Sequence, residues 1–400
     1  MSQHPATLPL ESVRDLMAPG APLPFRVIDA QGRMLLAQGQ CVQDVRQLKA
    51  LLERGACVAY DEVQAVRQAR EKGGGSSSAT QSTRQLTWFD RWERHIWDID
   101  DALRQVGHEA AAAPLLAQLV QQQMALVASQ PDAALFTLLR QDDKRMALYA
   151  LSHARHTALV VQLTAGLLGW DAERVQCAVA VALTMNASIV ELQARMADQA
   201  DPPSKKQMDQ IRAHPAKSAE MLRASGITDA EWLTGVEDHH EHKGAGGYPR
   251  SIDAPGDLAC VVRAADVYAA KMSPRTLRPA VLPQAAARQL FQEDPGSNVA
   301  AALIRAVGLY PPGEWVRLKS GEGGIVVRRA PVGGSTAGSP SAGAAVGAEV
   351  AVLLTAAGKA VTSGLRRDTA QAEFAIAGAL VDRSAVPRVL PEQVFGLIYA

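Results

Sequence analysis

Residues 237–250 read EDHHEHKGAGGYPR, and this stretch decides how the rest of the chain is interpreted. Two consecutive histidines, His239 and His240, stand near its start, and a neutral imidazole is the commonest side-chain metal ligand. The glycines that follow let the backbone approach a ligand closely, and Arg250 can hold a phosphate through paired hydrogen bonds. A plain core helix end needs no such polar edge, so the stretch predicts a ligand site.

Histidines are concentrated in the middle of the chain. Six of the nine lie between residues 153 and 242: His153, His156, His214, His239, His240 and His242. Asp266, within AADVYAA, adds a hard oxygen ligand. A single histidine in a helical protein is more often structural than a ligand, and it is the adjacent pair that favours a metal. Both interpretations stay open for each of the six.

The hydrophobic pattern is helical from Leu86 to about Leu309, because apolar residues recur at spacings of three and four and Ala, Leu and Gln dominate. Asp171 is expected to cap one helix, and Ser204 with Gln207 forms a capping box for another. Short β-like segments before residue 60 and after Tyr310 predict strands. We therefore expect a multidomain, mainly α protein with a small N-terminal α+β module and a β-rich C-terminal extension.

Composition marks the expected boundaries. The run GGGSSS at 73–78 is typical of a flexible linker, and a Gly/Ser/Ala-rich stretch near the C-terminus is typical of a disordered loop. The expected parts are the N-terminal module 1–72, the linker 73–84, a helical connector 85–139, a helical domain 140–312, and the C-terminal extension 313–400 with a flexible loop at 332–348.

Charge and cysteine content exclude several classes of protein. The 41 basic and 41 acidic side chains give a formal charge of zero, which argues against a nucleic-acid polymer as partner. The four cysteines show no CxxC spacing, which argues against a disulfide framework and a thiolate zinc site. No secretory signal is evident, and polar residues interrupt the apolar stretch 175–190. We expect a cytoplasmic protein without membrane insertion.

The stretch HHEHKGAGGYPR resembles the signature of the HD-GYP family, in which two histidines and a glutamate precede a loop ending Gly-Tyr-Pro. The chain keeps the matching residues His239, His240, Glu241, Gly247, Tyr248 and Pro249. SHARHTA around His153, IRAHPAKSAEML around His214 and RAADVYAAKMSPR around Asp266 resemble further family segments in the same order. The resemblance covers about residues 140–312.

The resemblance implies an HD-type helical bundle that opens cyclic di-GMP with water activated between two or three metal ions. It also implies the metal ligands, which would be His153, His214, His239, His240 and Asp266. The loop residues Gly247, Tyr248, Pro249 and Arg250, together with Arg275, would contact the dinucleotide. Such residues could hold one divalent ion, Mn, Fe or Zn, or could be relics that hold none.

The sequence departs from its family at the His-Asp pair that gives the family part of its name. Met185 stands at the histidine, Asn186 at the aspartate and Ile189 at a nearby lysine, and no His or Asp occurs between Asp171 and Asp198 to replace them. An amide lacks the anionic oxygens that bridge two divalent cations, and a thioether is a weak ligand for such metals. The loop is altered as well, with Gly244 where an aspartate is usual.

Three functions remain open. The first is a degenerate HD-GYP protein of bacterial cyclic di-GMP signalling that lacks phosphodiesterase activity and acts on protein partners as a regulatory or scaffolding module. The second is a receptor that binds cyclic di-GMP without cleaving it, through Arg250, Arg275 and the GYP loop. The third is a metal-dependent phosphodiesterase with a mononuclear site. The sequence leaves the oligomeric state and the signal received by the N-terminal module undetermined.

Overall fold

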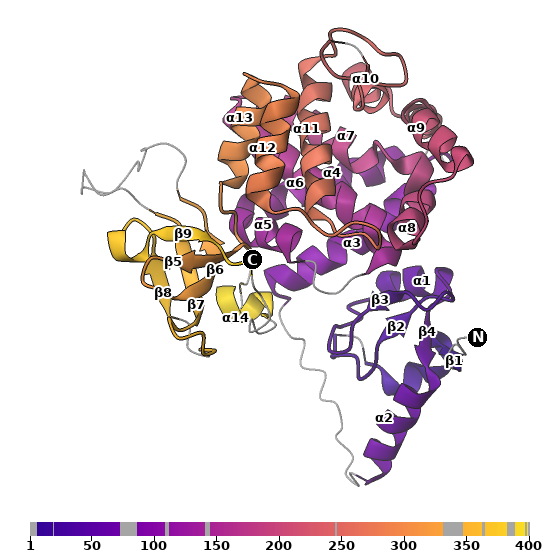
Figure 1. Ribbon diagram of the computed structural model, residues 1–400. Helices are drawn as coiled ribbons and strands as arrows, with labels where there is room; N and C mark the ends of the chain where they lie inside the picture. Colours follow the sequence, from indigo (N-terminus) through magenta and orange to yellow (C-terminus); the bar gives the residue numbers. More distant parts are fainter. Residues whose placement is uncertain are drawn as a thin grey trace.

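A computed structural model describes residues 6–18, 20–72, 86–108, 112–140, 145–244, 246–330, 347–361, 365–381, 389–396 and 398. The expected linker 73–84 and nearly all of the expected loop 332–348 lie outside this range. Within it, three parts follow one another along the chain: a small sheet with helices, a large helical region, and a second sheet (Figure 1).

The N-terminal module is built on an antiparallel sheet of order β1-β4-β2-β3. Its elements are β1 (Thr7–Pro9), the 3-10 helix η1 (Leu10–Leu16), β2 (Val27–Ile28), β3 (Met34–Leu36), α1 (Val45–Glu53), β4 (Cys57–Ala59) and α2 (Tyr60–Lys72). Asp44 caps α1 by accepting from the amide of Gln47, and Gly55 after the helix has a φ of 66°. The α+β character expected from the sequence is therefore present.

The helical region carries the bulk of the chain. Its elements are α3 (Trp88–Gln105), α4 (Ala112–Ser129), α5 (Pro131–Leu139), η2 (Met146–Leu148), α6 (Tyr149–Leu167), α7 (Ala172–Thr184), η3 (Ala187–Ile189), α8 (Val190–Asp198), α9 (Lys205–Ala224), α10 (Ala230–Asp238), α11 (Asp257–Met272), α12 (Pro283–Glu293) and α13 (Asn298–Val307). Asp171 caps α7, and Ser204 with Gln207 forms the capping box of α9, as the sequence predicts.

Helix α6 lies at the centre of this region. It is buried on most of its surface and packs against α7, α11 and α13 (Figure 1). A helix that is apolar nearly all round belongs in the core of a large domain. One hydrophobic core runs from the N-terminal module through α3 and α4 to α13, so the connector at 85–139 packs directly onto the helices that follow it.

The C-terminal extension is an antiparallel sheet of order β8-β7-β6-β5-β9. Its elements are β5 (Trp315–Leu318), β6 (Gly323–Arg328), β7 (Glu349–Leu354), β8 (Arg366–Asp368), η4 (Ala372–Phe374), β9 (Ile376–Ala379) and α14 (Pro391–Phe395). The ring of Phe395 in α14 contacts Phe89 of α3 and Phe136 of α5. The extension is thereby attached to the helical region.

One segment of the described residues, 172–198, is long and apolar enough by composition to cross a bilayer. Of its most apolar 18-residue window, 67% is buried within the protein. The segment is also divided into α7, η3 and α8. These features are typical of a core element.

Candidate functional site

Helices α6, α8, α9 and α11, the end of α10 and the turn after α7 surround a small cavity. His153 comes from α6, His214 from α9, His240 from the end of α10, and Asp266 from α11. The cavity has a volume of about 150 Å³. Its wall consists of Tyr149, His153, Asn186, Ile189, Gln193, Met196, Ile211, His214, His240, Tyr248, Asp266, Ala270 and Arg275. We refer to it as the histidine pocket.

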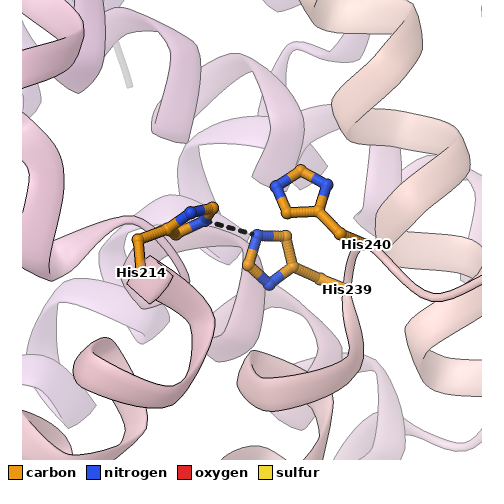
Figure 2. A group of neighbouring side chains, drawn as sticks. All are labelled: His214, His239 and His240. Carbon is orange, nitrogen blue, oxygen red and sulfur yellow. Dashed lines mark hydrogen bonds between the residues drawn. The ribbon is translucent and has the colours of Figure 1, made fainter. Parts of the chain in front are cut away.

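Three imidazoles form the most compact group at this pocket. One ring nitrogen from each of His214, His239 and His240 lies within 4.8 Å of the others (Figure 2). The Nε2 atoms of His214 and His239 are 3.0 Å apart. His239 is fully buried behind the two that line the cavity. Three imidazole donors are enough to hold one transition-metal ion.

The other ring nitrogens show which tautomers are present. Nδ1 of His214 donates to the carbonyl of Ile211, and Nδ1 of His239 donates to that of Val236 at 2.7 Å. In two neutral rings with these protons, both Nε2 atoms carry lone pairs that face each other. A shared cation relieves that repulsion, and metal-binding histidines commonly donate their second N–H to a backbone carbonyl. The donor set therefore fits a metal ion.

Burial keeps these imidazoles neutral. Desolvation, followed by the neighbouring His239, lowers the pKa of His214 to about 3. Desolvation also lowers the pKa values of His239 and His240, the latter strongly. Neutral rings are the form that binds metals, so this cluster is electrostatically ready for a cation.

His153 and Asp266 pair with each other across the pocket. Nε2 of His153 lies 2.6 Å from Oδ1 of Asp266. Burial alone would raise the pKa of Asp266, but the hydrogen bond with His153 and the electrostatic influence of the His153, His240 and His239 rings hold it below its usual range. The carboxylate is therefore ionised and available to a cation.

Tyr149 and Arg275 fix His153 from the opposite side. The Tyr149 ring stacks on His153 with centroids 5.9 Å apart and an interplanar angle of 7°. The Arg275 guanidinium lies 4.7 Å from the centre of the Tyr149 ring, and its Nε donates to the phenol oxygen at 2.8 Å. The sequence reasoning missed Tyr149, although its position four residues before His153 puts both on one helix face.

The residues at the altered His-Asp position separate into two environments. Asn186 and Ile189 line the histidine pocket, whereas Met185 is fully buried in the hydrophobic core. Ser188 lies between Asn186 and Ile189. Its hydroxyl donates to the carbonyl of His214 at 3.2 Å and contacts the Ser218 hydroxyl, and these two contacts hold the turn on α9. The structure thus places an amide and an alkyl group at the pocket wall.

The GYP loop is anchored by one buried carboxylate. Glu241 is fully buried and accepts the backbone amides of Arg250 at 2.7 Å, Ser251 at 3.0 Å and Ile252 at 3.1 Å. A Cβ added to Gly247 would lie 2.6 Å from Cα of Glu241, so this close packing requires glycine. Glu241 is part of the signature in the sequence, but nothing in the sequence indicates that its carboxylate anchors the loop.

Of the five residues predicted to contact the dinucleotide, two line the histidine pocket and three do not. The Tyr248 ring stacks on His240 with centroids 4.4 Å apart, and both Tyr248 and Arg275 line the pocket. Gly247, Pro249 and Arg250 do not line it. The guanidinium of Arg250 instead pairs with Asp238, and half of its side chain is exposed. Pro249 follows a cis peptide bond.

Two other histidines of the predicted concentration lie elsewhere. His156 is buried beside a second cavity and takes no part in the histidine pocket. His242 is half-buried after the cluster, with Nδ1 near the carbonyl of Lys243. His156 lies three residues after His153 on α6, yet its side chain lines the second cavity and not the histidine pocket.

A mainly helical protein that gathers imidazoles and a carboxylate from separate helices is a candidate metal-binding domain. Comparison with known proteins finds one curated relative. The chain is 32% identical over 126 residues to the cyclic di-GMP phosphodiesterase PA4108 of Pseudomonas aeruginosa, a match that covers 30% of each chain. The chain thus spans less than a third of that relative's length. This similarity supports the resemblance to the HD-GYP family that the motifs indicate.

A solved structure of an HD-GYP-type protein, Bd1817 from Bdellovibrio bacteriovorus, matches with a TM-score of 0.48 and 14% identity, and covers 74% of this chain and 97% of that one. No family model matches the chain.

Proposed function

We propose that this chain is a cytoplasmic protein of cyclic di-GMP signalling that lacks phosphodiesterase activity and acts on protein partners as a regulatory or scaffolding module. The observation that carries the proposal is the wall of the histidine pocket. Among the described residues that line it, Asp266 is the single carboxylate, and the turn after α7 contributes Asn186 and Ile189. A two-metal centre needs oxygen ligands that neutralise and bridge both cations, and one carboxylate is a poor basis for it.

One metal ion is compatible with the same residues. His214, His239 and His240 would hold it, with Asp266 and His153 as the adjacent oxygen and nitrogen donors. When bound, a divalent ion such as Mn, Fe or Zn would supply Lewis-acid chemistry towards a phosphate. His153 would keep Asp266 oriented and ionised, while Tyr248 would cover His240. This mononuclear arrangement leaves a weak phosphodiesterase as one alternative function.

Binding of cyclic di-GMP without cleavage is the second alternative. Tyr248 offers a ring and Arg275 a cation at the pocket wall. The pocket volume of about 150 Å³ is well below the roughly 300–1,000 Å³ of typical ligand sites, so a phosphate fits and a whole dinucleotide does not. Arg250 would have to leave Asp238 before it could reach a ligand. For these reasons we favour a scaffolding function over a function as a cyclic di-GMP receptor.

Metal content and turnover on one full-length sample test the proposal. We expect at most one metal ion per chain and no linear dinucleotide after incubation of cyclic di-GMP with Mn²⁺ or Fe²⁺. Asn186→Asp should raise metal affinity, because it adds an anionic oxygen at the pocket wall. Asn298→Asp makes the same chemical change at an exposed helix start and serves as the control. Steady linearisation by the unaltered chain would refute the proposed lack of activity.

A titration with cyclic di-GMP in the absence of turnover separates the two inactive functions. Saturable binding that Arg275→Gln weakens would favour the receptor, because Arg275 lines the pocket. No binding would favour the scaffold.

A further inference from the structure

A second cavity lies apart from the histidine cluster, where the three parts of the chain meet. It has a volume of about 550 Å³. Residues 37–43 of the N-terminal module, the start of α3, helix α6 and residues 389–392 of the C-terminal extension line it. Its size is within the range of sites for organic ligands. Tyr149 lines both cavities, but none of the clustered histidines 214, 239 and 240 reaches this one.

Three buried side chains on this cavity have polar atoms without a hydrogen-bond partner. They are Arg155 at Nε, Trp92 at Nε1, and His156 at both ring nitrogens. Each of the three residues is at most 4% exposed. Buried polar atoms are normally satisfied, and each unsatisfied one costs about 1–3 kcal/mol. Arg and Trp side chains can only donate, so the missing partner is an acceptor.

Arg155 is also a buried charge without a carboxylate. Its guanidinium donates a hydrogen bond to the carbonyl of Trp92 at 2.6 Å and lies 4.6 Å from the centre of the Trp92 ring. Burial lowers the pKa of the guanidinium to about 9, so it remains protonated at neutral pH. An isolated buried cation is unfavourable unless an anion compensates it.

The acidic residues of the cavity wall form no direct ion pair with this charge, although the nearby Glu93 favours it electrostatically. Glu93 forms two hydrogen bonds with Arg145, at 2.6 and 2.9 Å. Asp90 is part of the capping box of α3. Glu392 lines the cavity as well, but none of these carboxylates lies within ion-pair distance of Arg155 among the described residues.

We propose that this cavity is a second ligand site, and that it binds a small organic anion whose carboxylate or phosphate contacts Arg155, His156 and Trp92. The N-terminal module adds Gln43, whose Oε1 is buried on the same cavity without a donor. A ligand with an N–H or O–H group at its other end would satisfy it. Such a molecule would connect the N-terminal module to α3 and α6.

Calorimetric titration of the full-length protein with inorganic phosphate, GMP and succinate tests the site. We expect at least one of these anions to bind with a dissociation constant that Arg155→Met raises at least tenfold. Arg155→Met should fold, because it removes a buried charge that has no carboxylate partner. Ser152→Phe provides an independent variant, because it fills the cavity from α6 and leaves every charge in place. Arg174→Met, outside the cavity, is the control and should bind like the unaltered protein.

The choice of anions separates the two chemistries. Binding of phosphate or GMP without succinate identifies a phosphate ligand, and the reverse identifies a carboxylate. If none of the three binds, or if binding survives both Arg155→Met and Ser152→Phe, the site is refuted. Should Arg155→Met fail to fold, Ser152→Phe alone decides.

Discussion

Removal of the Glu241 carboxylate should release the GYP loop while leaving the helices folded. The carboxylate is fully buried and accepts three backbone amides, from Arg250, Ser251 and Ile252. In Glu241→Gln, the remaining oxygen can keep the two bonds that Oε1 now accepts, at Arg250 and Ser251. The bond to Ile252 is lost, because the new NH₂ group faces another donor.

The size of the effect follows from the number and type of bonds. A hydrogen bond to a charged group contributes about 1.5–3 kcal/mol, so loss of one bond and of the charge should destabilise the closed loop by about 2 kcal/mol. Since 1.4 kcal/mol is a factor of ten, amide exchange at residues 250–252 should become roughly 30-fold faster. Glu241→Ala removes all three acceptor bonds and should accelerate exchange by about a thousandfold.

Hydrogen exchange followed by mass spectrometry on a peptide covering 248–253 measures this directly. Glu237→Gln is the matched control: it lies one turn earlier, and its carboxylate pairs with Arg223, whose side chain is half exposed. Exchange in the control should equal that of the unaltered protein. Unchanged exchange at 250–252 in both Glu241 variants would show that the loop is held by other contacts and would refute the anchoring role.

Three further changes test the fold around the site. Desolvation lowers the pKa of His95 to about 3, so the unfolded chain takes up a proton below about pH 6.5 that the folded chain does not bind. His95 should therefore contribute about 1.4 kcal/mol per pH unit to the loss of stability from pH 6.5 towards 3, beside the contributions of the other buried histidines. His95→Gln should reduce the slope in thermal melts by that amount, whereas the exposed His108→Gln should not. Arg54→Ala leaves the buried Asp100 with a more exposed arginine, Arg104, as its remaining partner. The free energy of unfolding should therefore fall by about 2–3 kcal/mol, and limited proteolysis should cleave the N-terminal module faster. An unchanged cleavage rate would contradict this. Gly235→Ala places a Cβ 2.6 Å from Cδ2 of a leucine on α11. The free energy of unfolding should fall by about 1–3 kcal/mol, which lowers the melting temperature. An unaltered melting temperature would mean that α7, α10 and α11 pack less closely than described.

The sequence predicts the element types well where local chemistry determines them. The caps at Asp171 and Ser204, the α+β character of the first module and the strands after Tyr310 all depend on short-range signals, and all are present in the structure. Four of the ligand candidates come from segments that are distant along the chain, in the order that the family resemblance indicates. His153, His214, His240 and Asp266 all line one pocket.

What could not be predicted depends on tertiary contacts. Nothing in the sequence near Arg250 shows that its guanidinium pairs with Asp238 rather than with a ligand. Likewise, the imidazole of His156 is one of six in a concentrated group, and only the packing of α6 directs it to the other cavity. The unpaired Arg155 is invisible in the sequence as well, because burial without a partner is a property of the assembled fold.

The spacing of the histidine pocket along the chain sets an order in which its donors become available during synthesis. His214, His239 and His240 lie within one short stretch, α9 and α10, whereas His153 and Asp266 are 113 residues apart and join only when α6 and α11 pack together. A nascent chain that has left the ribosome as far as His240 already carries three imidazoles close in sequence, and the carboxylate arrives afterwards. If an ion bound at that stage, it would bind before the Asp266 carboxylate has been synthesised, so imidazole nitrogens and not a carboxylate would select it.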